Sequence, residues 1–403
     1  MSATTLETLA IRDFRNLAHV ELTLPRGGAV IVGENGHGKS NLLEAAYYLQ
    51  LLRSARGARD AELVRFGAEG FHLSARGQFP LAREIRAGFL KAGSRKRVTQ
   101  DGAEAKRLTD ALGGVPCVLV SPRDAGIVAG TPADRRRFLD IALALSSPTY
   151  LAALAAYRGA LGRRNAALRE GGRRGGRQAM AGAAAWEPAL AEQGAVLRSA
   201  RGAWVAAHGE AYTRLVTAIG ERPGSAMRYV VRTSVREGVG ATGATGATDA
   251  MDAAQMSETA RVVPATVGDG TASLLAELEA TRERDLRTGI THAGPHRDDL
   301  ALTLAQRDLR RFGSAGQQRS AALVLRLLEL ATLRESIGGA PLLLLDDPFA
   351  ELDERRSACV LSLLGEAEIE QVVLAVPRAS EIPADFTRLA RFTIVDGAIA
   401  PAA

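Results

Sequence analysis

The segment GENGHGKS, Gly33 to Ser40, places three glycines ahead of a lysine and a serine. Glycines at this spacing let backbone N–H groups turn inward around phosphate oxygens, and a following helix adds its positive dipole end. The chain contains 47 Arg and 4 Lys (total 51), so a lysine here stands out against the composition. An ammonium reaches β- and γ-phosphate oxygens as a compact point charge, which a forked guanidinium does not reproduce. The pattern GxxxxGK[ST] therefore predicts a nucleoside triphosphate site in which Ser40 offers its hydroxyl to Mg²⁺. The residues assigned to this phosphate loop are Gly33, Glu34, Asn35, Gly36, His37, Gly38, Lys39, Ser40 and Asn41.

Two adjacent carboxylates, Asp346 and Asp347, follow four leucines in the segment PLLLLDD, residues 341–347. The apolar run predicts a fully buried strand, and open α/β sheets place their ligands at the carboxyl ends of such strands. We therefore expect Asp346 to bind Mg²⁺ and Asp347 to orient or deprotonate an attacking water. Together with Lys39, these residues form the predicted catalytic set. A solvated turn is the alternative interpretation of neighbouring aspartates.

Small residues open another predicted helix at Gly313 to Gln317. The free N–H groups at a helix N-terminus attract an anion, so this segment predicts a second phosphate contact. The alternative is an ordinary helix start that the Ser314 hydroxyl caps.

The elements that must position these residues follow from the apolar spacing. A buried strand is expected at residues 28–32 and a helix from Ser40 onward, which puts the glycines between strand and helix. Thr131 is a predicted N-cap, because Pro132 and the acidic Asp134 follow it at the first and third helical positions.

The amino-acid composition changes in the middle of the chain. Two long Ala/Leu-rich helices are expected at residues 149–170 and 188–219, joined by the glycine-rich segment 171–182, and they predict an antiparallel helical arm. Residues 238–260 are low-complexity sequence that we expect to be disordered.

In this order the motifs resemble the head of ABC-type ATPases, split by an insertion as in the SMC group. More specifically, the chain resembles the RecF family of bacterial recombination mediators, and the similar blocks extend over nearly its whole length. The blocks that carry the resemblance are LAIRDFRNL (residues 9–17), GENGHGKSNLLEA (33–45), TPADRRRFLD (131–140), GPHRDDL (294–300), GQQR (316–319) and LLLLDD (342–347).

The resemblance implies a mechanism based on ATP and Mg²⁺. It implies that Ser314, Gly316 and Gln317 of one subunit contact the γ-phosphate held by the loop of the other, so that ATP closes a head-to-head homodimer. Asp353 is the matching D-loop residue. The family binds DNA at gaps, at junctions of single and double strands and on duplex, and it acts with RecO and RecR to load a recombinase. Transporter heads carry glutamate where Asp347 stands, and the shorter side chain implies slow hydrolysis.

The implied fold is an α/β ATPase head with a mixed sheet, assembled from N- and C-terminal parts around an inserted helical arm. We expect the head to comprise residues 1–125 and 288–403, and the arm residues 126–287 with an insertion near 236–268.

Composition and charge agree with a protein that binds an anionic partner. The 403 residues carry a net charge of +6 with a pI near 9.7, and 46% are hydrophobic. The two cysteines form no CxxC pair, which disfavours a disulfide framework or a zinc site. Neither a signal peptide nor a membrane span is predicted, so we expect a cytoplasmic protein without a membrane partner.

Two basic runs are candidate DNA contacts. Residues 158–177 contain seven arginines and one glutamate, and residues 83–107 contain eight basic and three acidic residues. Contact with the phosphate backbone is one interpretation, and solvated faces of an arginine-rich chain are the other. The candidate DNA-binding residues are Arg163, Arg164, Arg173 and Arg174.

Some alternatives stay open. In the segment GPHRDD, His296, Asp298 and Asp299 could form a metal site, although a hydrogen-bonded start of a strand is more common. The motor subunit of a membrane transporter and a DNA scaffold with structural ATP are the rival functions.

Overall fold

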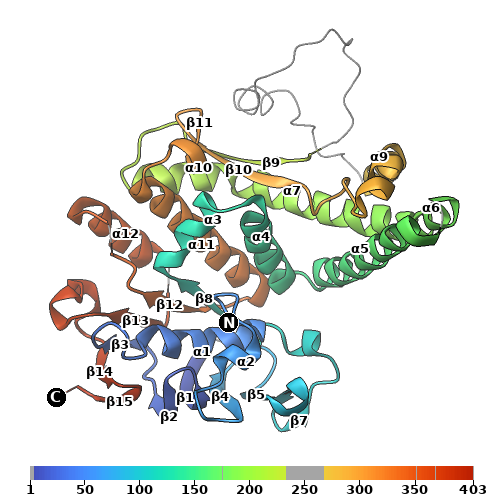
Figure 1. Ribbon diagram of the computed structural model, residues 1–403. Coiled ribbons are helices and arrows are strands. Elements are labelled where there is room, and N and C mark those ends of the chain that lie inside the picture. Colours follow the sequence, from blue (N-terminus) through green and yellow to red (C-terminus); the bar gives the residue numbers. More distant parts are fainter. Residues whose placement is uncertain (1–3, 175, 233–266, 351, 368, 403) are drawn as a thin grey trace. The chain divides into compact units, whose positions relative to one another are not determined.

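The computed structural model describes residues 4–174, 176–232, 267–350, 352–367 and 369–402. Side chains are described for the same ranges except 171–174, 176–179 and 267. The chain forms two compact units (Figure 1). The first unit comprises residues 1–125, 218–221 and 319–403, and the second comprises 126–217 and 222–318. The segment 238–260, which the sequence predicts to be disordered, lies outside the described residues, as does most of the expected insertion near 236–268.

The first unit contains a six-stranded sheet in the order β15-β14-β3-β13-β12-β8, which we call the parallel sheet. All its neighbouring pairs are parallel except β14 and β15. Its strands are β3 (Gly28–Val32), β8 (Cys117–Val120), β12 (Leu342–Asp346), β13 (Val372–Val376), β14 (Ala390–Val395) and β15 (Ala398–Pro401). The two strands predicted at residues 28–32 and 342–345 are thereby confirmed, and β13 lies between them.

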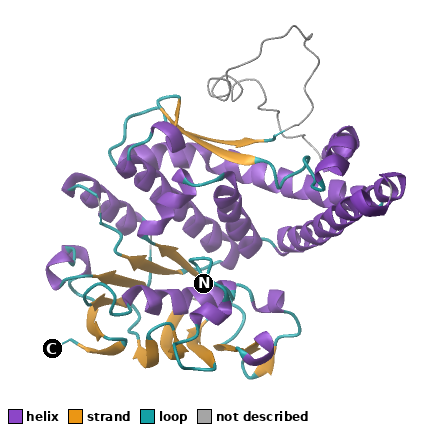
Figure 2. Cartoon of the chain, viewed as in Figure 1, coloured by secondary structure: helices purple, strands orange, loops and turns teal. Residues whose placement is uncertain are grey.

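A second six-stranded sheet, in the order β2-β1-β4-β5-β6-β7, is antiparallel throughout, and we call it the antiparallel sheet (Figure 2). Its strands are β1 (Thr5–Phe14), β2 (Leu17–Thr23), β4 (Gly70–Gln78), β5 (Glu84–Leu90), β6 (Arg95–Gln100) and β7 (Ala103–Glu104). Apolar and polar residues alternate along β4 and β5, as expected of a sheet with one buried face.

Helix α1 (Lys39–Leu51) packs between the two sheets, because it contacts β12, β8 and β13 of one and β1, β4 and β5 of the other. Every side chain from Leu42 to Leu51 is buried, which is typical of a helix that has no solvent-facing side. The helix predicted from Ser40 is therefore confirmed, and it forms the centre of this unit.

The other elements of the first unit are α2 (Asp60–Leu63), η1 (Ala92–Ser94), η2 (Leu108–Ala111), η3 (Pro122–Asp124), α12 (Glu354–Glu366), η4 (Ala379–Glu381) and η5 (Ala384–Phe386). Helix α3 (Ala125–Ala129) begins at the last residue of the segment 1–125 and belongs otherwise to the second unit. Helix α11 (Ala315–Ile337) contributes residues to both units.

The second unit is mostly helical. Its elements are α4 (Pro132–Ser146), α5 (Pro148–Arg174), α6 (Gly176–Ala184), α7 (Glu187–Ala218), α9 (Val267–Thr288), α10 (Leu309–Phe312) and the antiparallel strands β9 (Ala226–Val230), β10 (Asp299–Leu304) and β11 (Arg307–Asp308). Helix α4 begins as predicted, since the backbone N–H of Thr131 donates to Asp134 at 2.7 Å. The glycine-rich segment 171–182 is helical on both sides of residue 175, whereas the sequence predicted a connection there. Helices α5 and α6 are in contact with each other.

Buried arginines hold the second unit together. Each of four arginines is at most 6% exposed and lies against carboxylates from another segment. The main pairs are Arg135 with Asp299, Arg164 with Glu187 and Asp285, Arg198 with Glu277 and Asp298, and Arg201 with Asp140. Each of these arginines needs a carboxylate partner, because an unpaired buried charge is strongly destabilising.

Candidate nucleotide-binding site

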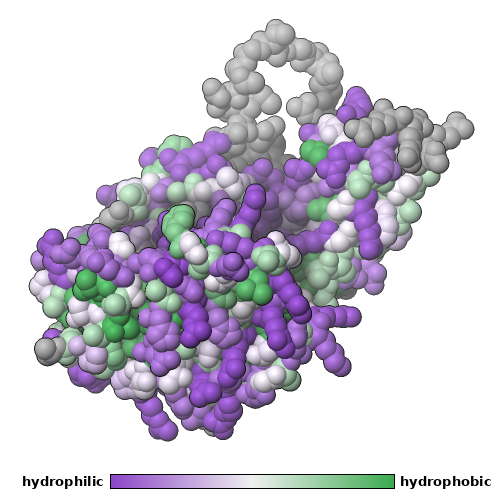
Figure 3. All heavy atoms as spheres, turned by 60° about the horizontal axis from the view of Figure 1, so that its bottom comes forward, coloured by the Kyte–Doolittle hydropathy of each residue, from purple (hydrophilic) through white to green (hydrophobic). Residues whose placement is uncertain are grey.

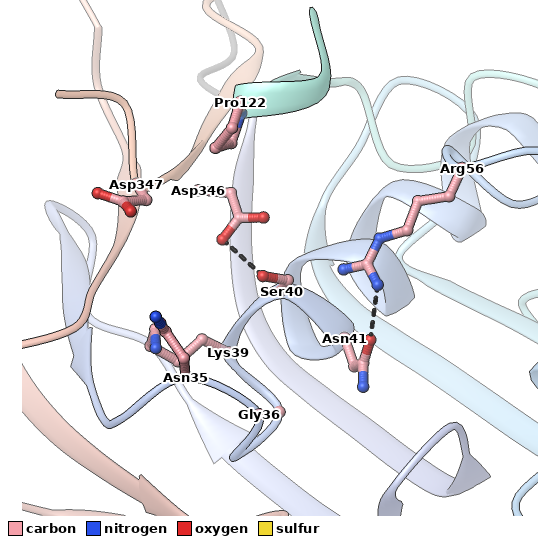
Figure 4. Close-up of a pocket in the computed structure, with 10 residues that line it drawn as sticks. Asn35, Gly36, Lys39, Ser40, Asn41, Arg56, Pro122, Asp346 and Asp347 are labelled. Carbon is pink, nitrogen blue, oxygen red and sulfur yellow. Dashed lines mark hydrogen bonds between the residues drawn. The ribbon is translucent and has the colours of Figure 1, made fainter. Parts of the chain in front are cut away.

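The pocket in the first unit follows from the direction of its strands. Because β3, β8 and β12 run in one direction, their carboxyl ends meet at one edge of the parallel sheet, where ligands bind in open α/β sheets. A cavity of about 350 Å³ lies there (Figure 4). Its lining residues are Asn35, Gly36, Gly38, Lys39, Ser40, Asn41, Arg56, Pro122, Asp346 and Asp347. The structure thus brings most of the predicted phosphate loop and both predicted aspartates together.

The phosphate loop depends on glycine conformations. Gly36 and Gly38 have φ angles of 90° and 112°, a region that other residues rarely adopt. The Lys39 ammonium donates to the Glu34 carbonyl at 2.9 Å and to the Gly33 carbonyl, both within the loop. Burial lowers the pKa of Lys39, and the negative charges of Asp346 and Asp347 oppose that shift.

Ser40 and Asp346 form the predicted metal-ligand pair. The Ser40 hydroxyl donates to the Asp346 carboxylate at 2.8 Å (Figure 4). Burial raises the pKa of Asp346, and the bond from Ser40 and the charges of Arg56 and Lys39 counteract it. A hydroxyl beside a carboxylate is the hard-oxygen donor set that Mg²⁺ prefers.

Asp347 is held through its backbone. Its φ angle of 48° is unusual for a non-glycine residue, and its N–H donates to the Ala375 carbonyl at 3.0 Å. The Arg319 guanidinium donates to the Asp347 carbonyl at 2.9 Å. Burial is the main cause that raises the pKa of the Asp347 carboxyl, and the nearby charge of Glu381 raises it further. A carboxylate with a raised pKa suits the role of a general base.

Arg56 is a pocket residue that sequence reasoning missed. Its guanidinium donates to the Asn41 side-chain oxygen at 3.1 Å (Figure 4). It also lies 3.7 Å from the Glu44 carboxylate. Glu44, which is 1% exposed, also accepts from Arg15 at 3.2 Å and from the Ser54 hydroxyl. These contacts hold the Arg56 guanidinium beside the phosphate loop. No motif in the sequence relates the position of Arg56 to that of Lys39.

The turn between β14 and β15 supports the loop from its far side. The Asp396 N–H donates to His37 Nδ1 at 2.9 Å, and the Gly397 N–H donates to the His37 carbonyl at 2.9 Å. His37 thus positions the loop and is absent from the lining of the cavity. Asn16 completes this support, since it accepts from Asn41 at 2.8 Å.

The predicted signature residues lie at the start of α11 and belong to the second unit. Ser314 is exposed, its N–H is bonded to the Gln317 side chain at 2.9 Å, and Gly316 follows it in the first turn. Asp353 is exposed and caps α12, where it accepts from the Arg356 N–H at 2.8 Å. The Ser314 hydroxyl accepts from the Gln317 N–H at 3.3 Å, so Ser314 caps α11 as the alternative interpretation predicts, and the first N–H groups of both helices stay without an intrahelical partner.

The predicted DNA-binding arginines differ in their surroundings. Arg163 is exposed and lies over the Trp186 ring at 4.9 Å. Arg164 is fully buried and bonded to Asp285 and Glu187 at 2.7 and 3.0 Å, so it has no surface to offer a phosphate, and we withdraw it from the DNA-binding set. The side chains of Arg173 and Arg174 lie outside the described residues.

The GPHRDD segment forms hydrogen bonds in place of a metal site. His296 is bonded to Tyr157 at 2.6 Å and to the Thr291 carbonyl at 3.0 Å, and burial lowers its pKa to about 4. Asp298 and Asp299 accept from buried arginines, and β10 begins at Asp299. Within the part of the chain that the structure describes, no group of three or more His, Cys, Asp and Glu side chains could hold a metal.

Among the described helices, none combines the length and apolar content that crossing a bilayer requires.

No family model matches the chain. Curated relatives match it over most of its length. The DNA replication and repair protein RecF of Myxococcus xanthus strain DK1622 is 36% identical over 375 residues, covering 93% of this chain and 91% of the relative. The protein of the same name from Anaeromyxobacter dehalogenans strain 2CP-1 is 37% identical over 399 residues, covering 98% and 99%.

Solved structures give the same result. The recombination mediator protein RecF-ATP in the RecFOR pathway superposes with a TM-score of 0.81 at 26% identity, covering 100% of this chain and 99% of that one. An SMC head bound to the C-winged helix domain of ScpA superposes with a TM-score of 0.52 at 15% identity, covering 98% and 97%, and shows the fold alone. The predicted α/β head with an inserted helical arm is thereby confirmed, with α7 as its long inserted helix.

Proposed function

This chain belongs to the RecF family, as its motifs predict, and from that premise we propose that it is an ATP-switched DNA-binding mediator of recombinational repair. The observation that carries the proposal is the single pocket in which Lys39, Ser40 and Asp346 meet from opposite ends of the chain. ATP is the proposed ligand, which is also bound in the similar RecF structure.

Each pocket residue has a proposed task. The backbone of the phosphate loop and Lys39 hold the β- and γ-phosphates. Ser40 and Asp346 fit Mg²⁺, which when bound neutralises phosphate charge. Asp347 orients the attacking water and accepts its proton, and its raised pKa supports that task. Arg56 adds a second cation at the same loop.

We further propose that a second copy of the chain completes the site. Ser314 and Gly316 stand at an exposed helix start, which suits contact with the γ-phosphate of another subunit. Gln317 and the D-loop residue Asp353 would lie at the same dimer interface. The DNA partner would be gapped, junction or duplex DNA, and RecO and RecR would be the protein partners, in line with the RecFOR pathway of the similar structure.

The binding of fluorescent gapped, duplex and single-stranded DNA with and without ATP tests the function. Wild-type protein should prefer gapped DNA or duplex and bind it more tightly with ATP, whereas Asp346→Asn should lose the ATP effect. DNA affinity that is equal with and without ATP would favour the scaffold with structural ATP. Co-purification with a membrane subunit would favour the transporter.

A further inference from the structure

One face of the antiparallel sheet is uncovered. Along β4 the inward side chains, such as Phe71 and Leu73, are buried, whereas the outward ones, such as His72 and Arg76, are exposed. Strand β5 repeats the pattern, with Ile85 buried and its neighbours outward. Since α1 and α2 contact these strands on the buried side, the outward side chains form a surface of the first unit, which we call the outer sheet face.

The strand register places basic and small residues in rows across the outer sheet face. Arg12 on β1 lies opposite His72 on β4, which lies opposite Gly88 on β5, which lies opposite Arg97 on β6. The next row contains one arginine among small side chains, with a glutamate at each end, in the order Glu21, Ala10, Ser74, Arg86, Thr99 and Glu104. Small residues between arginines make the face flat, so guanidinium groups project above it. Figure 3 turns this lower side of Figure 1 forward and shows long hydrophilic side chains projecting from it.

Basic runs in the sequence do not define this face. Arg97 and Lys96 are neighbours, but Arg97 is outward and exposed and pairs with Glu104 at 2.9 Å, whereas Lys96 points inward and pairs with Asp60 at 2.7 Å. Conversely, Arg12 lies outside both basic runs, and within the described part of the chain it has no ion-pair partner.

Arg76 and Arg86 pair with Glu84 at 2.6 and 2.8 Å, and Arg97 pairs with Glu104 at 2.9 Å, so the repulsion that remains on the outer sheet face falls mainly on His72, opposite Arg12. Partial burial lowers the pKa of His72, and the charges of Arg86 and Arg12 lower it further, against the opposite effect of Glu84. Like charges directly opposite each other on a sheet are destabilising. A binding partner with negative charge would relieve that repulsion.

We propose that the outer sheet face binds the phosphate backbone of duplex DNA. The inference rests on the proposed DNA-binding function and assigns a surface to it. Arg12 and Arg97 are separated by three strand spacings of about 4.8 Å, or roughly 14 Å. Duplex DNA carries one charge per about 1.7 Å of its axis, so about eight phosphate charges fall within that span. The two rows contain no Phe, Tyr or Trp side chain, and His72 is their single ring between β1 and β6, which favours backbone contact over the base stacking that single strands use.

A pair of charge reversals tests the proposal. Arg12→Glu with Arg97→Glu changes the outer sheet face, and Arg26→Glu with Arg388→Glu makes the same charge change at exposed arginines of the same unit away from it. In a salt titration with a blunt 30-base-pair duplex, the face variant should bind about tenfold or more weakly, and its slope of log K against log salt should fall by roughly 2. The control variant should stay within about threefold of wild type.

The outcomes distinguish a wrong surface assignment from a wrong proposed function. Equal weakening in both variants, or wild-type binding by the face variant, overturns the assignment and leaves this face for an acidic protein partner. Failure of the wild-type protein to bind any duplex overturns the proposed function instead. Thermal unfolding and nucleotide binding serve as folding checks, and the milder Arg12→Gln with Arg97→Gln preserves the slope measurement if the reversals destabilise the unit.

His72 gives an independent readout. A phosphate bound between Arg12 and Arg86 would raise the pKa of His72, so binding would take up a proton and strengthen as the pH falls through the range between its free and bound pKa values. His72→Gln should remove this part of the pH dependence. An unchanged pH dependence in that variant would contradict a phosphate at this row.

Discussion

The Ser40 hydroxyl lies 2.8 Å from the Asp346 carboxylate, although the two residues are 306 positions apart in the chain. Parallel pairing explains the contact: β13 lies between β3 and β12, so the segments after β3 and β12 emerge at one edge. The nucleotide pocket is therefore a product of sheet topology rather than of any local segment.

Replacement of Lys39 by arginine should weaken ATP binding, because a planar fork cannot take the place of an ammonium that donates to two carbonyls of its own loop. Loss of a charged hydrogen bond costs about 1.5–3 kcal/mol, so we expect roughly tenfold to hundredfold weaker binding. Calorimetric titration with a non-hydrolysable analogue measures it, with exposed Lys91→Arg as the control. Unchanged affinity would contradict the assigned role.

Substitution of Glu381 by glutamine should move the acid limb of ATP hydrolysis to lower pH. The charge of Glu381 helps to keep the pKa of Asp347 above its usual value, and a base must be deprotonated to act. Removing that charge lowers the pKa of Asp347, so activity survives to more acidic pH. Single-turnover rates across pH measure the shift, and Glu354→Gln on α12 is the matched control. A shift to higher pH would refute the assignment of Asp347 as base.

A Ser314→Arg variant should bind ATP as a monomer and fail to form the ATP-dependent dimer. Ser314 is exposed at the start of α11, where a long cation would block contact with a phosphate of another subunit. Light scattering with a non-hydrolysable analogue gives the mass, and Thr387→Arg places the same side chain at an exposed site elsewhere. A Ser314→Arg protein that still dimerises rules out the arrangement in trans.

Neighbouring arginines on α5 should differ sharply in their effect on stability. Arg164→Leu leaves Glu187 and Asp285 buried without one of their cations, which costs about 3–5 kcal/mol. Arg163→Leu removes an exposed contact with Trp186 worth about 0.5–1 kcal/mol. Chemical denaturation followed by circular dichroism compares them. Equal stability of the two variants would contradict the structural role of Arg164.

The sequence predicts the parts of the site that depend on local patterns. The strand at 28–32, the helix from Ser40 and the buried strand before Asp346 each follow from apolar spacing and glycine positions, and all three are present. The resemblance to the RecF family can likewise be recognised from the sequence, because the motifs that carry it are short and contiguous.

Features that depend on tertiary partners escaped prediction. Arg56 follows α1 in the chain, and its guanidinium is oriented toward the pocket by contacts with Glu44 and Asn41. Arg164 belongs to a basic run, yet its charge is neutralised by residues 23 and 121 positions away. Charge counts in a sequence cannot distinguish an arginine that faces solvent from one that is paired inside.

The position of β3 has a consequence for synthesis on the ribosome. Among the described strands its partners are β13 and β14, which are translated more than 300 residues later. At about 5–20 residues per second, the delay is roughly 15–60 s. During that time an apolar strand has no partner, so a nascent chain is exposed to aggregation, and a chaperone that shields residues 28–32 should raise the yield of native protein.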